Sequence, residues 1–256
     1  MVHFVGAGPG AADLITVRGQ KLLMEADVII YAGSLVNPEH LNIAKEGCQI
    51  YDSAAMTLEE VIAVMKEAEA EGKMTVRLHT GDPSIYGAIR EQMDLLDPLG
   101  IKYDVVPGVS SCFGVAAALK AEYTLPNVSQ TVIITRMAGR TPVPEKEEIA
   151  LLAAHQATMI IFLSTGLLEP LRERLLIGGY KGDTPAAIVY KATWPDEKIF
   201  RGTVDTLPQI AKENGITKTA LIVVGEFLGD TYDRSKLYDP TFTHEFREAK
   251  YNFCRK

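Results

Sequence analysis

The sequence predicts an α/β fold made of two α/β domains with a cofactor cleft between them. Short apolar runs alternate with segments of helical period, which is the pattern of a parallel α/β protein. Two of these runs, 74–78 and 103–106, end in Gly/Pro turns that lead into helices. The alternation stops at 119–129 and then starts again. We therefore expect an N-terminal domain over residues 1–118, a C-terminal domain over 125–232 and a charged tail over 233–256.

Local signals predict the elements of the first half. Residues 2–6 and 28–31 are short apolar runs, and Asp13 can cap a helix that runs to about Glu25. Apolar residues at helical spacing predict a helix over 58–71, which Gly72 ends. The other elements expected here are strands at 74–78 and 103–106 and helices at 85–96 and 111–119.

The second half repeats the pattern after Pro126 and Asn127. A strand at 131–135 precedes a polar Gly/Pro-containing loop at 136–144, and the tail residues 243–255 form either a loose helix or no regular structure. The other elements expected here are a helix at 145–154 and strands at 158–163, 186–190 and 220–225.

Composition and charge exclude several classes of protein. The 256 residues are 47% hydrophobic, and no apolar run reaches the length of a membrane span or of a signal-peptide core. The net charge of −7 argues against general nucleic-acid binding. Cys48, Cys112 and Cys254 are scattered and lack the spacing of a metal site or a disulfide framework, which fits a reducing cytoplasm.

A glycine-rich turn, Gly6-Ala-Gly-Pro-Gly-Ala, follows the first strand. It fits the dinucleotide fingerprint in form, but a nicotinamide site also needs an acidic residue at the end of the second strand. That strand ends in Tyr31-Ala-Gly, and Asp27 lies at its other end. Nicotinamide binding is therefore the weaker reading, and a simple tight turn is the plainer one.

Two more strand ends carry candidate ligand contacts. In Thr80-Gly-Asp-Pro, Gly81 allows close approach of a ligand and Asp82 offers an acceptor, although this residue could serve only as a helix cap. Pro107-Gly-Val-Ser-Ser likewise places hydroxyl groups at a helix start. His79 either faces the cleft or is a structural histidine. Because parallel strands share a carboxyl edge, we expect these turns to meet in one crevice.

Arg136 and Arg140 follow the first strand of the second half. Surface arginines usually serve solubility, but two in a Gly/Pro loop can instead bind carboxylates through paired hydrogen bonds. Both readings stay open at this point.

These motifs together resemble the tetrapyrrole (corrin/porphyrin) methylases over almost the whole chain. The resemblance rests on Tyr31-Ala-Gly-Ser-Leu-Val-Asn-Pro-Glu, on the segment from His79 to Gln92, on Pro107-Gly-Val-Ser-Ser, and on the segment from Ser129 to Pro144. Thr80-Gly-Asp-Pro-Ser-Ile-Tyr favours the precorrin-4 branch, which methylates carbon 11 in vitamin B12 synthesis, over the uroporphyrinogen branch with its GGDPF motif. Tyr123 is a local departure outside the cofactor motifs.

The resemblance implies S-adenosylmethionine as cofactor, no metal, and two α/β domains with the cofactor between them. The family's cofactor contacts fall on these residues here: Pro9, Thr80, Gly81, Asp82, Ile85, Ser110, Ser111, Leu163, Ala192 and Ala220.

The implied substrate is a tetrapyrrole with many carboxylates, which an acidic protein must bind through a local basic lining. The candidates are Arg136, Arg140 and Lys191, with His79 as a further substrate contact; His79 and Asp82 are also the suspected general bases. The family's habit implies a homodimer. The cysteine usage predicts a cytoplasmic protein, and the charge and the short apolar runs argue against nucleic-acid and membrane partners. The alternatives are another tetrapyrrole methylase, a diphthine-synthase-type enzyme, a nicotinamide oxidoreductase and a non-catalytic tetrapyrrole binder.

Overall fold

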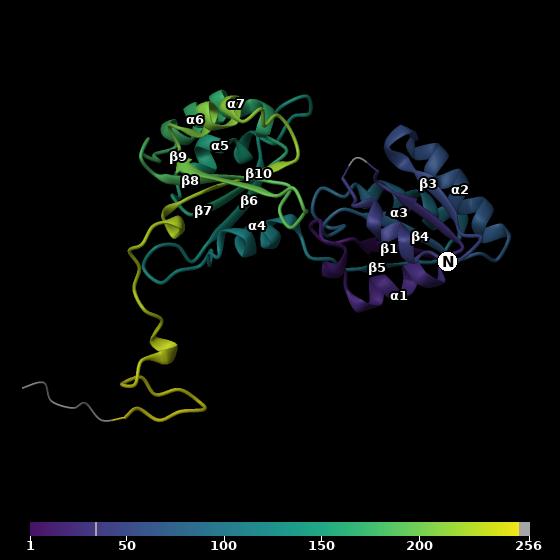
Figure 1. Ribbon diagram of the computed structural model, residues 1–256, viewed down its shortest axis with the longest axis horizontal. Coiled ribbons are helices and arrows are strands. Elements are labelled where there is room, and N and C mark those ends of the chain that lie inside the picture. Colours follow the sequence, from purple (N-terminus) through teal and green to yellow (C-terminus); the bar gives the residue numbers. More distant parts are fainter. Residues whose placement is uncertain (34, 251–256) are drawn as a thin grey trace, which may run out of the picture. The chain divides into compact units, whose positions relative to one another are not determined.

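The computed structural model describes residues 1–33 and 35–250 (Figure 1). Grouping by internal contacts divides the chain into two units. The first contains Met1–Ala118 and also Tyr190–Lys198, and the second contains Leu119–Val189 and the chain from Ile199 onward. Each unit has its own five-stranded sheet with helices, which confirms the predicted α/β class.

The first unit is built on a parallel sheet of strand order β3-β2-β4-β1-β5. Its central strand β4 lies between β1 and β2, and β1 lies between β4 and β5. The carboxyl ends of β4, β1 and β5 are therefore neighbours at one edge. The strands are β1 Val2–Gly6, β2 Val28–Tyr31, β3 Gln49–Asp52, β4 Thr75–His79 and β5 Tyr103–Val106, and the helices are α1 Val17–Glu25, α2 Leu58–Ala70, α3 Ile89–Leu96 and α4 Ser111–Leu119.

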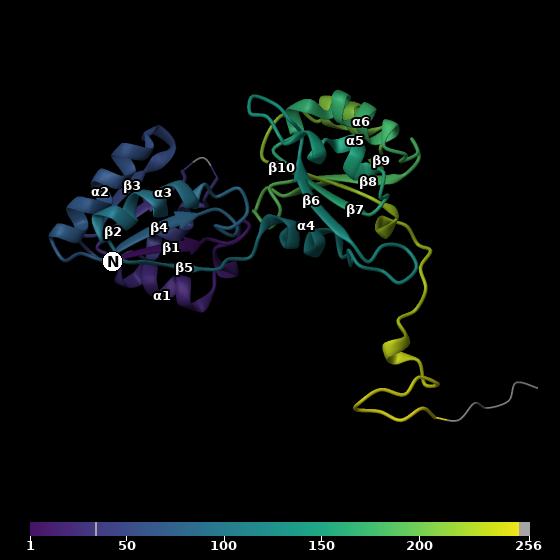
Figure 2. The ribbon, with the colours of Figure 1, turned by 180° about the vertical axis from the view of Figure 1, so that it is seen from behind.

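Both faces of this sheet are covered by helices (Figure 2). Alternation along β1 places Phe4 in a core with Met65 of α2 and Leu96 of α3. Val5 points to the other face and packs in a second core with Leu23 of α1. Burial on both faces explains why the inner strands β1 and β2 read as nearly continuous apolar runs.

The second unit has the strand order β6-β7-β10-β8-β9, in which β6 runs parallel and β10 antiparallel to β7. The sheet is therefore mixed, whereas the alternation predicted parallel strands throughout. Helices α5, α6 and α7 bury Ile149, Leu171 and Leu207 (Figure 1). The elements are β6 Val132–Arg136, β7 Thr158–Phe162, β8 Pro185–Tyr190, β9 Lys198–Thr203, β10 Ala220–Val224, α5 Ile149–Ala153, α6 Leu168–Ile177 and α7 Leu207–Glu213.

Three predicted helices differ from those observed. Asp13 lies in a 3-10 turn, and Thr16 caps α1 by accepting the Gly19 N–H. Helix α3 begins at Ile89 rather than at Ile85, because Tyr86 and Ala88 adopt left-handed backbone angles. The helix expected at 145–154 is a 3-10 turn followed by α5. Among the strands and α-helices of the described residues, β3, β9, α6 and α7 had no prediction.

The tail has a 3-10 turn at Lys236–Tyr238 and no helix over residues 243–250, the described part of the helix considered for 243–255. Arg247 donates hydrogen bonds to the Leu237 and Asp239 carbonyls. The rest of the helix considered for 243–255, and Cys254, lie outside the described residues.

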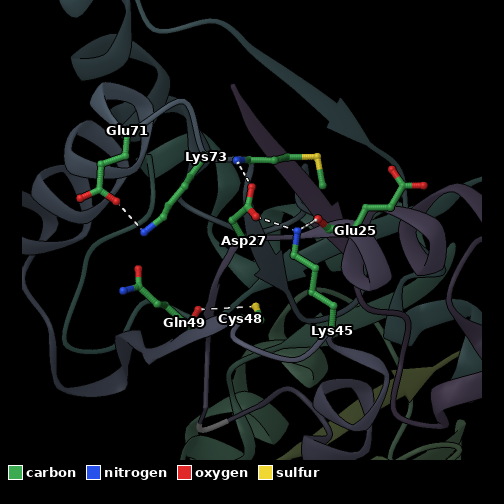
Figure 3. Close-up of polar contacts among 8 residues, drawn as sticks. Glu25, Asp27, Lys45, Cys48, Gln49, Glu71 and Lys73 are labelled. Carbon is green, nitrogen blue, oxygen red and sulfur yellow. Dashed lines mark hydrogen bonds and ion pairs between the residues drawn. The ribbon is translucent and has the colours of Figure 1, made fainter.

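A polar cluster lies at the amino-terminal edge of the first sheet (Figure 3). Asp27, just before β2, accepts hydrogen bonds from Lys45 Nζ at 2.6 Å and from the Met74 N–H at 2.8 Å. Lys45 Nζ also donates to the Glu25 carbonyl at 2.8 Å. The hydrogen bond from Lys45, followed by that from Met74, lowers the pKa of Asp27 below its ordinary 3.8. This cluster fastens the starts of β2 and β4 and is at the edge opposite to the predicted crevice.

Replacing Asp27 by Asn should lower stability without affecting activity. A lowered folded-state pKa stabilises the fold above pH 3.8, and this contribution is lost as the pH falls through the lowered value. The expected cost at neutral pH is about 0.5–1 kcal/mol, because the pair is partly exposed and screened. Urea unfolding at pH 7 and at acidic pH measures it. An Asp27→Asn deficit that does not shrink toward acidic pH would contradict this assignment.

Candidate active site

Three glycine-containing turns meet at the carboxyl edge of the first sheet. A Cβ added to Gly6, at the end of β1, would lie 2.6 Å from Gly108 Cα and 2.6 Å from the Gly81 carbonyl oxygen. A Cβ on Gly108 would lie 2.1 Å from that same oxygen. No side chain fits at these distances, so the backbones of three chain segments touch directly. The turns at the carboxyl ends of β1, β4 and β5 therefore meet backbone to backbone at this edge.

Hydrogen bonds join two of these turns. The Gly81 N–H donates to the Gly8 carbonyl at 2.8 Å, and the Gly8 N–H donates to the Gly81 carbonyl at 3.3 Å. Gly8 and Gly81 both have positive φ angles, of 85° and 61°. Turns of this conformation favour glycine, and the two hydrogen bonds make the glycine-rich turn a fixed part of this edge.

The Asp82 carboxylate links the end of β4 to the start of the segment after β5. One oxygen accepts the N–H and hydroxyl of Ser84, and the other accepts the Gly108 N–H at 2.8 Å. Burial raises the pKa of Asp82, but the hydrogen bonds from Ser84 and Gly108 outweigh burial, and the net pKa is lowered. Asp82 is therefore an ionised carboxylate that holds the two turns together, and it is a weak base.

Most of the predicted cofactor residues lie at this edge or in the turns that form it. Pro9 and Ser110 are buried, while Thr80, Asp82 and Ser111 are half-buried. Ser110 Cα lies 3.5 Å from the position of a Cβ on Gly81. The members of the set within the first unit are Pro9, Thr80, Gly81, Asp82, Ile85, Ser110, Ser111 and Ala192.

Ala192 reaches this unit through a segment that sequence reasoning missed. The strap, which we define as Tyr190–Lys198, connects two strands of the second sheet but groups with the first unit. Thr193 Oγ1 accepts the Ala11 N–H at 3.0 Å, and the Trp194 indole covers Gly10 so closely that a Cβ there would lie 2.1 Å from Cδ1. Trp194 is the chain's single tryptophan, and this was the one feature of the sequence that could have pointed to the strap.

The strap has a strained backbone held by its own polar contacts. Lys191 and Thr193 have φ angles of 47° and 70°, which are costly for residues with side chains. Glu197 accepts the Thr193 N–H at 2.6 Å, and Lys191 pairs with Asp196 at 2.7 Å. Lys191, predicted to bind substrate, also lies 5.1 Å from the Trp194 ring centroid, so its charge already has partners.

His79 is a buried, neutral side chain at the end of β4. It is only 4% exposed, and its ring centroid is 6.1 Å from that of Phe4. Burial, with a smaller contribution from the charge of Arg77, lowers the pKa of His79 to about 3. An uncharged, enclosed imidazole is unsuited to bind a carboxylate, so the structural reading left open for His79 fits better than substrate binding.

The second unit brings three other predicted residues to one edge of its sheet. Arg136 ends β6 opposite Phe162, and Leu163 directly follows that strand position. Extending the antiparallel register of β10 and β7 pairs Ala220 with Leu163. Leu163 is 67% exposed with a φ angle of 51°, and such strain in an exposed apolar residue is typical of functional sites.

The two arginines of the 136–144 loop differ in their surroundings. The Arg136 guanidinium donates to the carbonyls of Met137, Thr141 and Pro142, and so shapes its own loop. Arg140 is exposed and has no hydrogen bond or ion pair with the described residues. Arg140 is therefore the freer cation of the pair.

Within residues 1–33 and 35–250 no cluster of His, Cys, Asp or Glu could hold a metal ion. The helices of that same part are all too short or too polar to cross a membrane.

The comparisons with known proteins agree with these motifs. The sequence matches the Tetrapyrrole (Corrin/Porphyrin) Methylases over residues 1–208. It is 56% identical to the cobalt-precorrin-4 C(11)-methyltransferase of Methanocaldococcus jannaschii over 98% of both chains. The X-ray structure of a cobalt precorrin-4 methyltransferase of cobalamin biosynthesis matches with a TM-score of 0.88 and 49% identity, over 90% of this chain and 96% of that one.

A more distant neighbour carries a ligand in its crystal. The uroporphyrin-III C-methyltransferase of Thermus thermophilus, complexed with S-adenosylhomocysteine, matches with a TM-score of 0.73 and 25% identity, over 89% of this chain and 93% of that one. The family match covers well over half of the 256 residues, and the relatives match nearly end to end. The chain therefore belongs to the tetrapyrrole (corrin/porphyrin) methylase family.

Proposed function

We propose that this chain transfers a methyl group from S-adenosylmethionine to carbon 11 of cobalt-precorrin-4 in cobalamin biosynthesis. The single observation that carries the proposal is the near-complete match to a cobalt-precorrin-4 methyltransferase in both sequence and structure. The glycine-lined edge of the first unit supports it, because it offers the backbone approach that such a cofactor needs.

The residues at that edge fit the cofactor. Gly81 has a positive φ, and an added Cβ would already contact Ser110 Cα at 3.5 Å, so this turn depends on a residue without a side chain. Pro9, Thr80, Asp82, Ile85, Ser111 and Ala192 would complete the contacts in this unit. The family resemblance also implies cofactor contacts at Leu163 and Ala220. When bound, S-adenosylmethionine supplies a methyl group on a positively charged sulfur, which is already activated for transfer.

With an activated methyl group, the protein's task is to orient the reactants and exclude water. The fixed turns around Gly8 and Gly81 serve this purpose because their backbones are hydrogen-bonded to each other. Asp82 holds the turns and does not act as a base, since its pKa is lowered and both oxygens accept protein hydrogen bonds. The burial of His79 argues against it as the base.

The substrate's carboxylates require positive charge on an acidic protein. Arg140 is our principal candidate, with Arg136 shaping the loop that presents it. We also propose a cytoplasmic homodimer, as the family resemblance implies; sedimentation analysis tests the dimer.

A methyl-transfer assay tests the proposed function. The enzyme should methylate cobalt-precorrin-4 and give a product heavier by one methyl group, and it should bind S-adenosylmethionine but not NAD. Faster turnover of metal-free precorrin-4 would assign it to that substrate instead. Methylation of uroporphyrinogen III alone, or tetrapyrrole binding without methylation, would contradict the proposal.

Replacing Arg140 by Gln should weaken tetrapyrrole binding and leave cofactor binding unchanged. One lost pairing with a carboxylate is expected to cost about 1 kcal/mol, and the wild-type affinity should fall with added salt because exposed charges are screened. Titrations of the tetrapyrrole and of S-adenosylhomocysteine measure both. The double replacement with Arg136→Gln should be weaker still. Arg90→Gln, an exposed arginine of α3, is the matched control. An unchanged tetrapyrrole affinity in the double variant would mean that these arginines serve solubility and do not bind the substrate.

A further inference from the structure

A charged side chain that the mechanism does not use lies inside the first unit. Arg77 on β4 is 7% exposed, and none of the ion pairs among the described residues includes it. Burial lowers its pKa to about 10, so it stays protonated at neutral pH. Its Nε donates to Gln92 Oε1 at 3.2 Å, and its Nη1 donates to the Ile30 carbonyl at 3.1 Å. A buried positive charge is thus met only by neutral oxygens.

Arg77 fixes the orientation of the Gln92 amide. A guanidinium can only donate hydrogen bonds, so the amide must turn its oxygen toward Arg77. Its NH2 group then faces the other way and donates to the Ala88 carbonyl at 3.1 Å. Gln92 is itself 4% exposed, so water cannot readily replace either contact.

The Ala88 carbonyl ends a strained segment, the 83–88 loop, which we define as Pro83–Ala88. Tyr86 and Ala88 have φ angles of 55° and 50°, and Ala88 precedes α3 without a side-chain cap. Strained backbone persists only where its surroundings determine it. The loop directly follows Asp82 and contains Ile85, both proposed cofactor contacts.

We propose that Gln92 is a positioning residue for cofactor binding, holding the 83–88 loop through its bond to Ala88, and that Arg77 sets the direction of that bond. The inference rests on the proposed role of Asp82 and its loop in binding S-adenosylmethionine. The two residues lie in the interior: Gln92 contacts the backbone of the 83–88 loop, Arg77 contacts Gln92, and neither contacts the ligand.

Gln92→Glu separates positioning from general packing. Glutamate has the same shape and gives Arg77 a carboxylate partner, so the interior pairing with Arg77 is retained. The group that faces Ala88, however, changes from a donor to an acceptor and repels the carbonyl. Gln92→Met provides a second variant that lacks both hydrogen bonds but keeps the side chain's length. Gln209→Glu, on the exposed face of α7, is a control for the same replacement of a donating amide by a carboxylate, here beside Glu213 and outside the first unit.

The test is calorimetric titration with S-adenosylhomocysteine, alongside melting temperatures and the KM for S-adenosylmethionine. Gln92→Glu should bind about tenfold or more weakly, equivalent to about 1.4 kcal/mol. It should melt no lower than Gln92→Met, and its KM should rise more than its kcat falls. Gln209→Glu should match the wild type.

Asp82→Ala, measured in parallel, distinguishes the two ways of failing. If Asp82→Ala weakens binding while Gln92→Glu and Gln92→Met bind within twofold of the wild type, the positioning role is wrong and the cofactor loop stands. If Asp82→Ala also binds normally, the loop assignment itself is wrong and the positioning role falls with it. If Gln92→Glu does not fold, a folded Gln92→Met with normal affinity overturns the inference.

Discussion

Replacing Gly81 by Val should abolish cofactor binding in a folded protein. Gly81 has a φ angle of 61°, which costs a residue with a side chain about 1–2 kcal/mol, and a β-branched one more. The methyl groups of Val would also extend beyond a Cβ that already contacts Ser110 Cα at 3.5 Å, and so would crowd the turn that we assign to cofactor binding. We expect S-adenosylhomocysteine to bind about 100-fold more weakly or not at all, equivalent to about 2.7 kcal/mol or more. Calorimetry measures the loss.

Gly100→Val is the matched control for that experiment. Gly100 has a similar φ angle of 66° with nothing within 4 Å of an added Cβ, and it lies before β5, away from the carboxyl edge. Gly100→Val should therefore show the loss of thermal stability that the φ angle alone causes, while only Gly81→Val loses the cofactor. Full affinity in a folded Gly81→Val protein would remove the T-G-D-P turn from the cofactor site.

Replacing Gly10 by Ala should displace the strap and lower activity strongly. The added Cβ would lie 2.1 Å from Trp194 Cδ1 and 2.9 Å from the Ala192 carbonyl oxygen, so the indole or the turn must move. Overpacking of this kind costs about 1–3 kcal/mol. Since Trp194 is the only tryptophan, its emission spectrum reports the displacement directly. We expect a red-shifted emission together with a higher KM for S-adenosylmethionine.

Gly166→Ala serves as the comparison for the strap experiment. An added Cβ there meets only the Thr217 carbonyl oxygen, at 3.8 Å, so emission and KM should stay as in the wild type. If Gly10→Ala leaves the emission of Trp194 and the KM unchanged, then the strap does not influence the cofactor edge.

Local patterns predicted the carboxyl edge of the first unit well. Apolar runs followed by Gly/Pro turns placed β1, β4 and β5 correctly to within a residue or two, and parallel strands with buried faces explain why that signal was clear. The start of α3 was misplaced because Tyr86 and Ala88 are common in helices, and nothing local marks their left-handed conformation.

Features that depend on distant contacts could not be predicted. The strap groups with the first unit through Thr193 and Trp194, whose partners Ala11 and Gly10 are over 180 residues away in the sequence. The roles of Asp82 and Lys191 also depend on the residues that they contact in the folded protein. Residue type identified an acceptor and a cation, but not that each already had bonds within the protein.

The position of the transferred methyl group tests the proposed function most directly. Cobalt-precorrin-4 is incubated with the enzyme and S-adenosylmethionine labelled with carbon-13 in its methyl group, and the product is examined by NMR. We predict a single labelled methyl group attached to carbon 11. A label on another ring carbon, or no transfer to this substrate under conditions in which the cofactor binds, would contradict the proposed reaction.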